Sequence, residues 1–97
     1  MKRDALNERC TWMGRETALF AAARDKGTTR DQAMKQVESV NLQEPEQARE
    51  NREHLGLPDE RTDLREVVRQ VYEANPSTPP DQLAAKVNSE CSSASAQ

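Results

Sequence analysis

The sequence predicts an all-α fold, a small four-helix domain of two helical hairpins in which a disulfide joins the first and last helices. Apolar residues recur at steps of three and four in four separate segments, the spacing that places side chains on one face of a helix. Glycine, proline and polar capping residues separate these segments. One cysteine lies near each end of the chain, at Cys10 and Cys91.

The longest helical pattern runs over residues 6–26 and predicts the central helix of the domain. It contains Trp12 and Phe20, two of the three aromatic residues of the chain. Its apolar face is made by residues three or four positions apart, namely Leu6, Cys10, Met13, Thr17 and Phe20. Gly14 lies inside this pattern and costs about 1 kcal/mol relative to alanine, unless a neighbouring backbone needs the space. Gly27 ends the helix.

A second helix is expected after Gly27, with Thr28 as its N-cap and Asp31 three residues later. It should end near Asn41. Its buried stripe consists of Ala33, Met34, Val37 and Val40. Residues 43–62 are rich in Gln, Glu, Arg and Asn, which predicts a mobile connection with a short, weakly held helix over residues 46–54.

Two further helices are predicted in the C-terminal half. The first runs over residues 59–74 and is built on Leu64, Val67, Val68, Val71 and Tyr72. The second begins after Thr78 as N-cap, with Pro79 in the first helical position. Its inner face consists of Leu83, Ala84, Val87 and Cys91. We expect a single domain over residues 1–91, followed by a disordered small-polar tail over residues 92–97.

Residues 27–37 and 77–87 resemble each other, because both combine a Thr near the helix start with Asp-Gln and a later valine. This internal similarity favours two hairpins in a pseudo-symmetric arrangement, although capping chemistry recurring by chance accounts for it equally well.

The composition indicates one domain with a thin core. The chain has 97 residues, of which 34% are hydrophobic and 32% charged, so it is near the size at which small folds need a disulfide or a partner subunit. The formal charge is −3 and is unevenly divided: residues 1–36 carry eight Lys/Arg against five Asp/Glu, and residues 37–97 carry six against twelve. This acidity argues against nucleic-acid binding. No apolar run long enough for membrane insertion occurs.

The two cysteines lie on the apolar faces of the first and last predicted helices, so antiparallel packing of these helices would bring Cys10 and Cys91 together. A disulfide here would close a loop of roughly eighty residues and stabilise the fold by about 4.5 kcal/mol at most. One cysteine near each end is a common layout in oxidising compartments. The alternatives are two reduced, buried cysteines or a redox switch. A metal site would need His54 as a third ligand, and no ligands stand at close spacing.

Enzymatic activity is not predicted, because the chain has one histidine, no glycine-rich phosphate loop and no nucleophile in a recognisable motif. No cofactor is expected. Residues 22–40 have the helix-turn-helix layout of DNA-binding proteins, in which Arg30, Gln32 and Lys35 would face the DNA. Asp31 at the front of that helix and the pI of about 5.2 argue against this. A cytosolic helix-turn-helix regulator is therefore the alternative function.

A structural or protein-binding role remains. Trp12 is the candidate contact for a protein partner or a homodimer, although a large aromatic residue on a central helix more often belongs to the core.

A resemblance supports an exported protein. The pattern Cys10-Thr11-Trp12-Met13, an alanine-rich helix that ends in Arg24-Asp25-Lys26-Gly27, a late Val71-Tyr72 pair and a terminal Cys91 resembles small uncharacterised exported helical proteins of Gram-negative bacteria. The resemblance implies a disulfide-clasped periplasmic helical domain and brings no known activity or binding residues.

The chain starts without a signal peptide, so it is either cytosolic or a mature exported chain with an added methionine. We expect a non-enzymatic periplasmic protein-interaction or stress-related module.

Overall fold

The computed structural model describes residues 2–42 and 44–95, and in them all regular secondary structure is helical. The helices are α1 (Lys2–Asp25), α2 (Arg30–Ser39), α3 (Glu46–Leu55), α4 (Glu60–Glu73) and α5 (Pro80–Ser95). The prediction of an all-α fold is confirmed, but the described residues form five helices rather than four. The additional helix is α3, which the sequence predicted only as a weakly held part of a mobile connection. Gly56 ends it in the left-handed conformation, with φ +70°.

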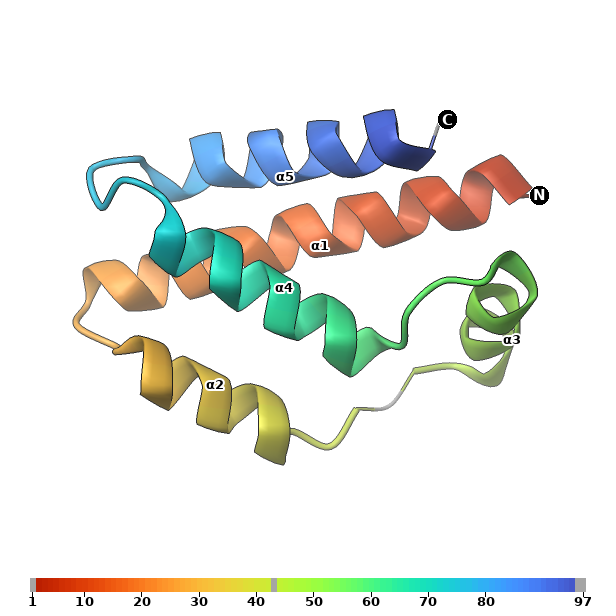
Figure 1. The fold of residues 1–97 in the computed structure, drawn as a ribbon, viewed down its shortest axis with the longest axis horizontal. Helices are drawn as coiled ribbons and strands as arrows, with labels where there is room; N and C mark the ends of the chain where they lie inside the picture. Colours follow the sequence, from red (N-terminus) through yellow and green to blue (C-terminus); the bar gives the residue numbers. More distant parts are fainter. Residues whose placement is uncertain (1, 43, 96–97) are drawn as a thin grey trace.

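The helices pack around α1 (Figure 1). Helix α5 runs antiparallel beside α1, α4 packs on α1 as well, and α3 meets the N-terminal part of α1. Helix α2 packs against α4. None of these packed pairs joins helices that follow one another in the chain, so the closest packing in the domain is not that of the two predicted helical hairpins. The resulting domain is flat, with extents of 38 × 28 × 15 Å.

Two hydrophobic clusters form the core, and α4 contributes to both. The first cluster consists of Met13, Ala21, Val67, Val71, Leu83 and Val87, from α1, α4 and α5. The second consists of Ala33, Val37, Leu64 and Val68, from α2 and α4. The apolar stripe of α2 therefore packs mainly on α4, and Trp12 and Phe20 of α1 contact the same cluster.

Most helix boundaries differ from the predicted ones by one or two residues, whereas α1 begins at Lys2, four residues earlier than predicted. The caps explain the difference at α2. Its N-cap is Thr29 rather than Thr28. The Thr29 side chain accepts a hydrogen bond from the Gln32 backbone N–H, and Gln32 Oε1 accepts one from the Thr29 N–H at 2.9 Å. The carbonyl of Thr28 instead accepts a hydrogen bond from the Tyr72 hydroxyl at 2.6 Å. Helix α2 ends at Ser39 because Val40 has extended backbone angles.

The two C-terminal helices start later than predicted. Asp59 is the N-cap of α4, and its carboxylate accepts a hydrogen bond from the Thr62 N–H at 2.8 Å. Helix α5 begins at Pro80 and continues to Ser95. Residues 92–95, predicted as part of a disordered tail, are therefore helical, because small polar residues can extend a helix that is already packed. The remaining tail, residues 96–97, lies outside the described residues.

The close contact between α1 and α5 explains Gly14. A Cβ atom at this position would lie 3.1 Å from the carbonyl oxygen of Ala84 and 3.3 Å from Cβ of Asn88. Glycine thus lets the two backbones approach, as the sequence left open. Within the described residues, none of the helices combines the length and the apolar character that crossing a membrane requires.

Candidate functional site

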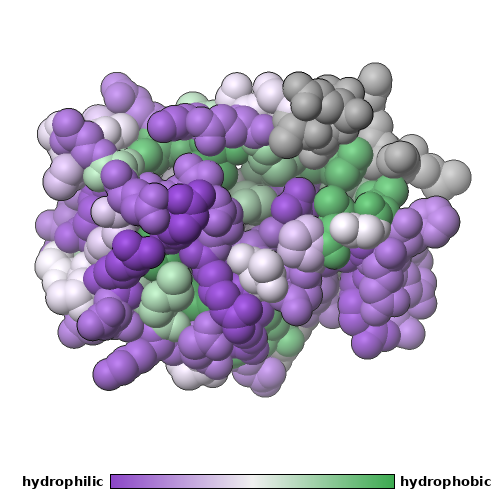
Figure 2. Space-filling view, viewed as in Figure 1, coloured by the Kyte–Doolittle hydropathy of each residue, from purple (hydrophilic) through white to green (hydrophobic). Residues whose placement is uncertain are grey.

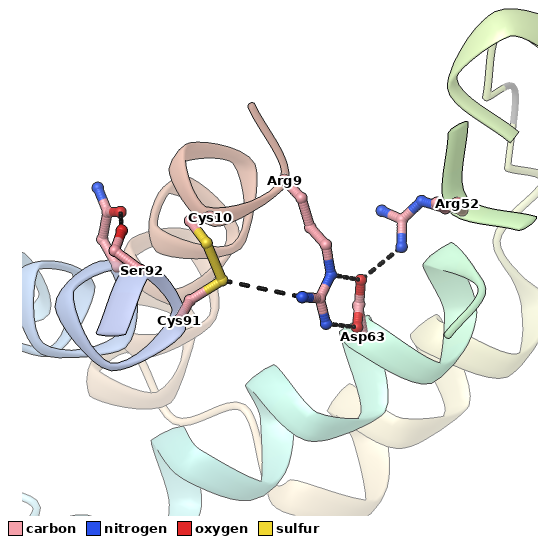
Figure 3. Close-up of a disulfide and its surroundings, with 7 residues drawn as sticks. Arg9, Cys10, Arg52, Asp63, Cys91 and Ser92 are labelled. Carbon is pink, nitrogen blue, oxygen red and sulfur yellow. Dashed lines mark hydrogen bonds and ion pairs between the residues drawn. A yellow bond between two sulfur atoms is a disulfide. The ribbon is translucent and has the colours of Figure 1, made fainter. Parts of the chain in front are cut away.

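The predicted disulfide is present. The Sγ atoms of Cys10 and Cys91 are 2.09 Å apart and their Cα atoms 5.5 Å apart, across a sequence separation of 81 residues. The bond joins the N-terminal part of α1 to the C-terminal part of α5, and Cys10 is buried (Figure 3). Cys10 and Cys91 are therefore not reduced core residues, and their sulfur atoms cannot bind a metal while the disulfide is formed.

A buried ion cluster lies next to the disulfide and joins three helices (Figure 3). Asp63 of α4 is 2% exposed and accepts hydrogen bonds from arginines on two sides. Arg9 of α1 binds both carboxylate oxygens, with Nε at 2.9 Å and Nη2 at 2.8 Å. Arg52 of α3 donates from Nη1 at 2.5 Å. Such paired geometry offsets the cost of removing the Asp63 charge from water.

Arg52 connects α3 to the rest of the domain through four groups. Besides Asp63, its guanidinium donates to Glu44 at 2.5 Å and to the carbonyl of Pro58 at 2.8 Å. It also lies over the ring of Trp12, 5.6 Å from the ring centre, in a cation–π contact. Burial alone would lower the pKa of Arg52, but hydrogen bonds to Asp63 and Glu44 outweigh it and raise that pKa. Arg52 is therefore permanently charged.

A groove of about 290 Å³ lies above this cluster, between the N-terminal part of α1 and α3. Figure 2 shows hydrophobic side chains at the surface in this region, beside a mostly hydrophilic exterior. The apolar part of the lining consists of Ala5, Trp12, Pro45, Ala48, Leu55 and Leu57. The polar part consists of Glu8, Arg9, Glu44, Asn51, Arg52 and Glu60. An apolar floor with a few polar groups is the usual lining of a binding site in proteins.

Among the side chains that the structure describes, the lining of the groove carries a net negative charge. Three carboxylates, those of Glu8, Glu44 and Glu60, line it together with Arg9 and Arg52, and both arginines also pair with the buried Asp63. Burial and the neighbouring Glu44 raise the pKa of Glu60 above its ordinary value of 4.5, although Arg52 acts in the opposite direction. Burial of this carboxylate therefore outweighs the attraction of Arg52.

The structure places Trp12 both in the core and at the surface. The side chain is half-buried, packs against both hydrophobic clusters and lines the groove. The two alternatives for Trp12, core residue and partner contact, are therefore compatible. His54, the third ligand that a metal site would need, is exposed. In the part of the chain that the structure describes, no three side chains of the metal-binding types form a group that would hold a metal ion.

The residues of the helix-turn-helix alternative are partly engaged elsewhere. The side chain of Gln32 belongs to the capping box of α2, and Arg30 lies 3.7 Å from the carboxylate of Glu73. Lys35 is exposed. Because α2 packs more closely on α4 than on α1, residues 22–40 do not form the compact helix pair that the sequence pattern suggested.

Sequence reasoning missed the ion cluster, although two of its members left a signal. Asp63 stands four residues before Val67, and Arg9 four residues before Met13, so both charges fall on apolar helix stripes. A charged residue at such a position requires a partner. Arg52 left no comparable signal, because it lies in a segment that is polar throughout.

Comparisons of the chain with protein-family models, with curated proteins and with solved structures find no match, so the site is interpreted from its own geometry.

Proposed function

We propose that the chain is a non-enzymatic protein-interaction module of the periplasm, and that it binds its partner in the groove between α1 and α3. The observation that carries this proposal is the groove itself, in which Trp12 and other apolar side chains lie at the surface above a buried and fully paired ion cluster. Half-buried tryptophan is enriched at positions that dominate binding energy.

The disulfide supports the proposed compartment. Disulfides that persist in small domains are typical of oxidising environments such as the periplasm. Here the bond connects helices at opposite ends of the chain, and the flat core contains few large side chains. A domain of this kind depends on its crosslink, so a reducing compartment would weaken it.

The buried ion cluster supports a preformed site. Arg9, Arg52 and Asp63 come from three helices, and their ion pairs fix α1 and α3, which line the groove, before any partner arrives. A preformed floor lowers the entropic cost of binding. The cluster has no nucleophile or general base in a reactive arrangement, and its carboxylates serve as hydrogen-bond acceptors for arginine.

Site-specific photo-crosslinking in the cells that make the protein tests the proposal. A photoreactive residue at Ala48, which lines the groove, should give discrete adducts with another polypeptide. The same residue at Lys35, exposed on α2, should give none and serves as the matched control. The proposed site would be contradicted if both positions gave adducts with the same polypeptide in the same yield, or if the position of Ala48 gave no adduct.

The compartment is tested in the same cells. We expect the chain to fractionate with periplasmic proteins and to show no free thiols when it is alkylated under denaturing conditions after acid quenching. Recovery of the chain in the cytosolic fraction with both cysteines alkylated would refute the periplasmic assignment.

A further inference from the structure

We propose that the groove between α1 and α3 recognises a segment of its protein partner in which a lysine or arginine stands next to a large apolar side chain. This inference deepens the proposed function and rests on it. It specifies the chemistry of the partner, which a crosslinking adduct does not reveal.

The apolar part of the ligand follows from the groove floor. Trp12 of α1, Leu55 at the end of α3 and Leu57 just after α3 line it, with Ala48 as the small residue that leaves the space open. A volume of about 290 Å³ is at the lower end of the range of small-molecule pockets. A side chain or two from an extended segment fit this space better than a large cofactor does.

The cationic part follows from the carboxylates. Glu8 and Glu60 line the groove, and the arginines beside them already donate to Asp63 and Glu44. An anionic ligand would therefore compete with existing acceptors for these donors. A cation beside Glu60 would instead meet a carboxylate that lines the groove and whose ionised form is disfavoured by burial, as its raised pKa indicates. Charge complementarity thus favours a basic segment over an acidic one.

The test uses the intact, disulfide-bonded chain and short capped peptides without tryptophan. Trp12 is the only tryptophan of the chain and lines the groove, so its fluorescence reports occupation directly. The probe is acetyl-Lys-Leu-Lys-Phe-Lys-Leu-amide. One control peptide replaces every lysine by glutamate, and a second replaces the leucines and the phenylalanine by serine. We expect saturable changes in emission with the probe, none with the glutamate peptide and much weaker binding of the serine peptide.

Two matched variants locate the charge contact. Glu60→Gln removes a carboxylate of the groove, and Glu53→Gln removes one from the exposed part of α3 outside it. Because both lower the acidity of the chain equally, a non-specific attraction would weaken equally in the two. We expect Glu60→Gln to raise the Kd of the probe about threefold to tenfold, because one partly desolvated charge contact is lost. Glu53→Gln should leave this Kd unchanged.

The inference is overturned if the glutamate peptide binds as well as the probe, if the two glutamine variants weaken binding equally, or if Trp12 emission does not respond to the probe. These failures are distinguishable from failure of the proposed function. Adducts from Ala48 in cells together with an unresponsive Trp12 would retain the binding site and reject the basic ligand. Absence of adducts would reject the site itself.

Discussion

The pair of helices α1 and α5 and the helix α3 are held in the domain by different physical means. Helices α1 and α5 are joined by a covalent bond and by a close backbone approach at Gly14. The buried residue of helix α3 is Arg52. Its ion pairs, a hydrogen bond and a cation–π contact hold α3 against the rest of the domain. The groove lies between the firmly fixed helix and the electrostatically held one.

This difference matters for binding, because one wall of the groove is rigid and the other can adjust. Segments with few buried apolar contacts open at lower free energy than the core of a domain. A partner that contacts both α1 and α3 would stabilise the closed arrangement. Loss of the covalent attachment should therefore have consequences different from loss of the electrostatic one.

Removing the disulfide should have the largest effect. Reduction, or the double change Cys10→Ala and Cys91→Ala, releases a loop with a sequence separation of 81 residues. We expect the free energy of unfolding to fall by up to about 4.5 kcal/mol, because the unfolded chain regains its loop-closure entropy. Urea denaturation with and without reductant measures this. The double variant should match the reduced chain and should not respond to reductant; a difference below about 1 kcal/mol would show that the bond is dispensable.

Asp63→Asn should destabilise the domain by about 3 kcal/mol, because it leaves the buried Arg52 and the partly buried Arg9 without their shared carboxylate. The matched control is Glu38→Gln, which breaks the exposed pair with Arg65 and should cost less than about 1 kcal/mol. Chemical denaturation of both variants provides the comparison. Equal losses would mean that burial of the cluster does not strengthen it.

Arg52→Met should release α3 while it leaves the other helices in place. The change removes the bonds to Asp63, Glu44 and the Pro58 carbonyl but retains most of the aliphatic stem. We expect a loss of about 2 kcal/mol, seen in hydrogen exchange as lower protection of α3 amides. Arg49→Met, at an exposed position of the same helix, is the control. Uniform loss of protection over α1 and α5 would contradict local release.

The contrast between the two regions also explains what the sequence could predict. The α1 pattern and the position of Cys10 on it follow from local periodicity, so the disulfide and the all-α class were predictable. Which helix meets which is a non-local matter. The valines of α4 form a stripe wide enough for two neighbours, and only packing decides that Val67 meets α1 while Val68 meets α2.

The groove was not predictable for a related reason. Its floor needs Arg52, and the segment around Arg52 consists of residues that are equally typical of exposed connections. Trp12 was identified as a candidate contact because it is large and aromatic. The sequence could not state that Arg52 would stack on it, since the two residues are brought together by the docking of α3 on α1.

A smaller effect is expected for Glu60→Gln, and it depends on pH. Burial and Glu44 raise the pKa of Glu60 in the folded state, so the folded chain binds this proton more tightly than the unfolded chain does. Ionisation of Glu60 therefore lowers the free energy of unfolding as the pH rises from about 4.5, the ordinary pKa of a glutamate, through the raised pKa of the folded state. The variant should be more stable than the parent at pH 7, by less than about 1 kcal/mol, and this advantage should vanish below pH 4.5. Urea denaturation across this pH range measures it, and an advantage that grows on acidification would contradict it.

Gly14→Ala should have the smallest net effect, and it links the backbone approach to the covalent bond. Alanine gains about 1 kcal/mol of helix propensity. Its Cβ, however, would press on the Ala84 carbonyl at 3.1 Å, which is a backbone atom that moves only if α5 shifts away from α1. The disulfide one turn away opposes that shift. We therefore expect Gly14→Ala to be neutral or destabilising by up to about 1 kcal/mol in the oxidised chain and stabilising in the reduced chain, where the helices can separate. Denaturation of the four species measures this coupling, and an identical effect in both redox states would show that the close approach does not depend on the crosslink.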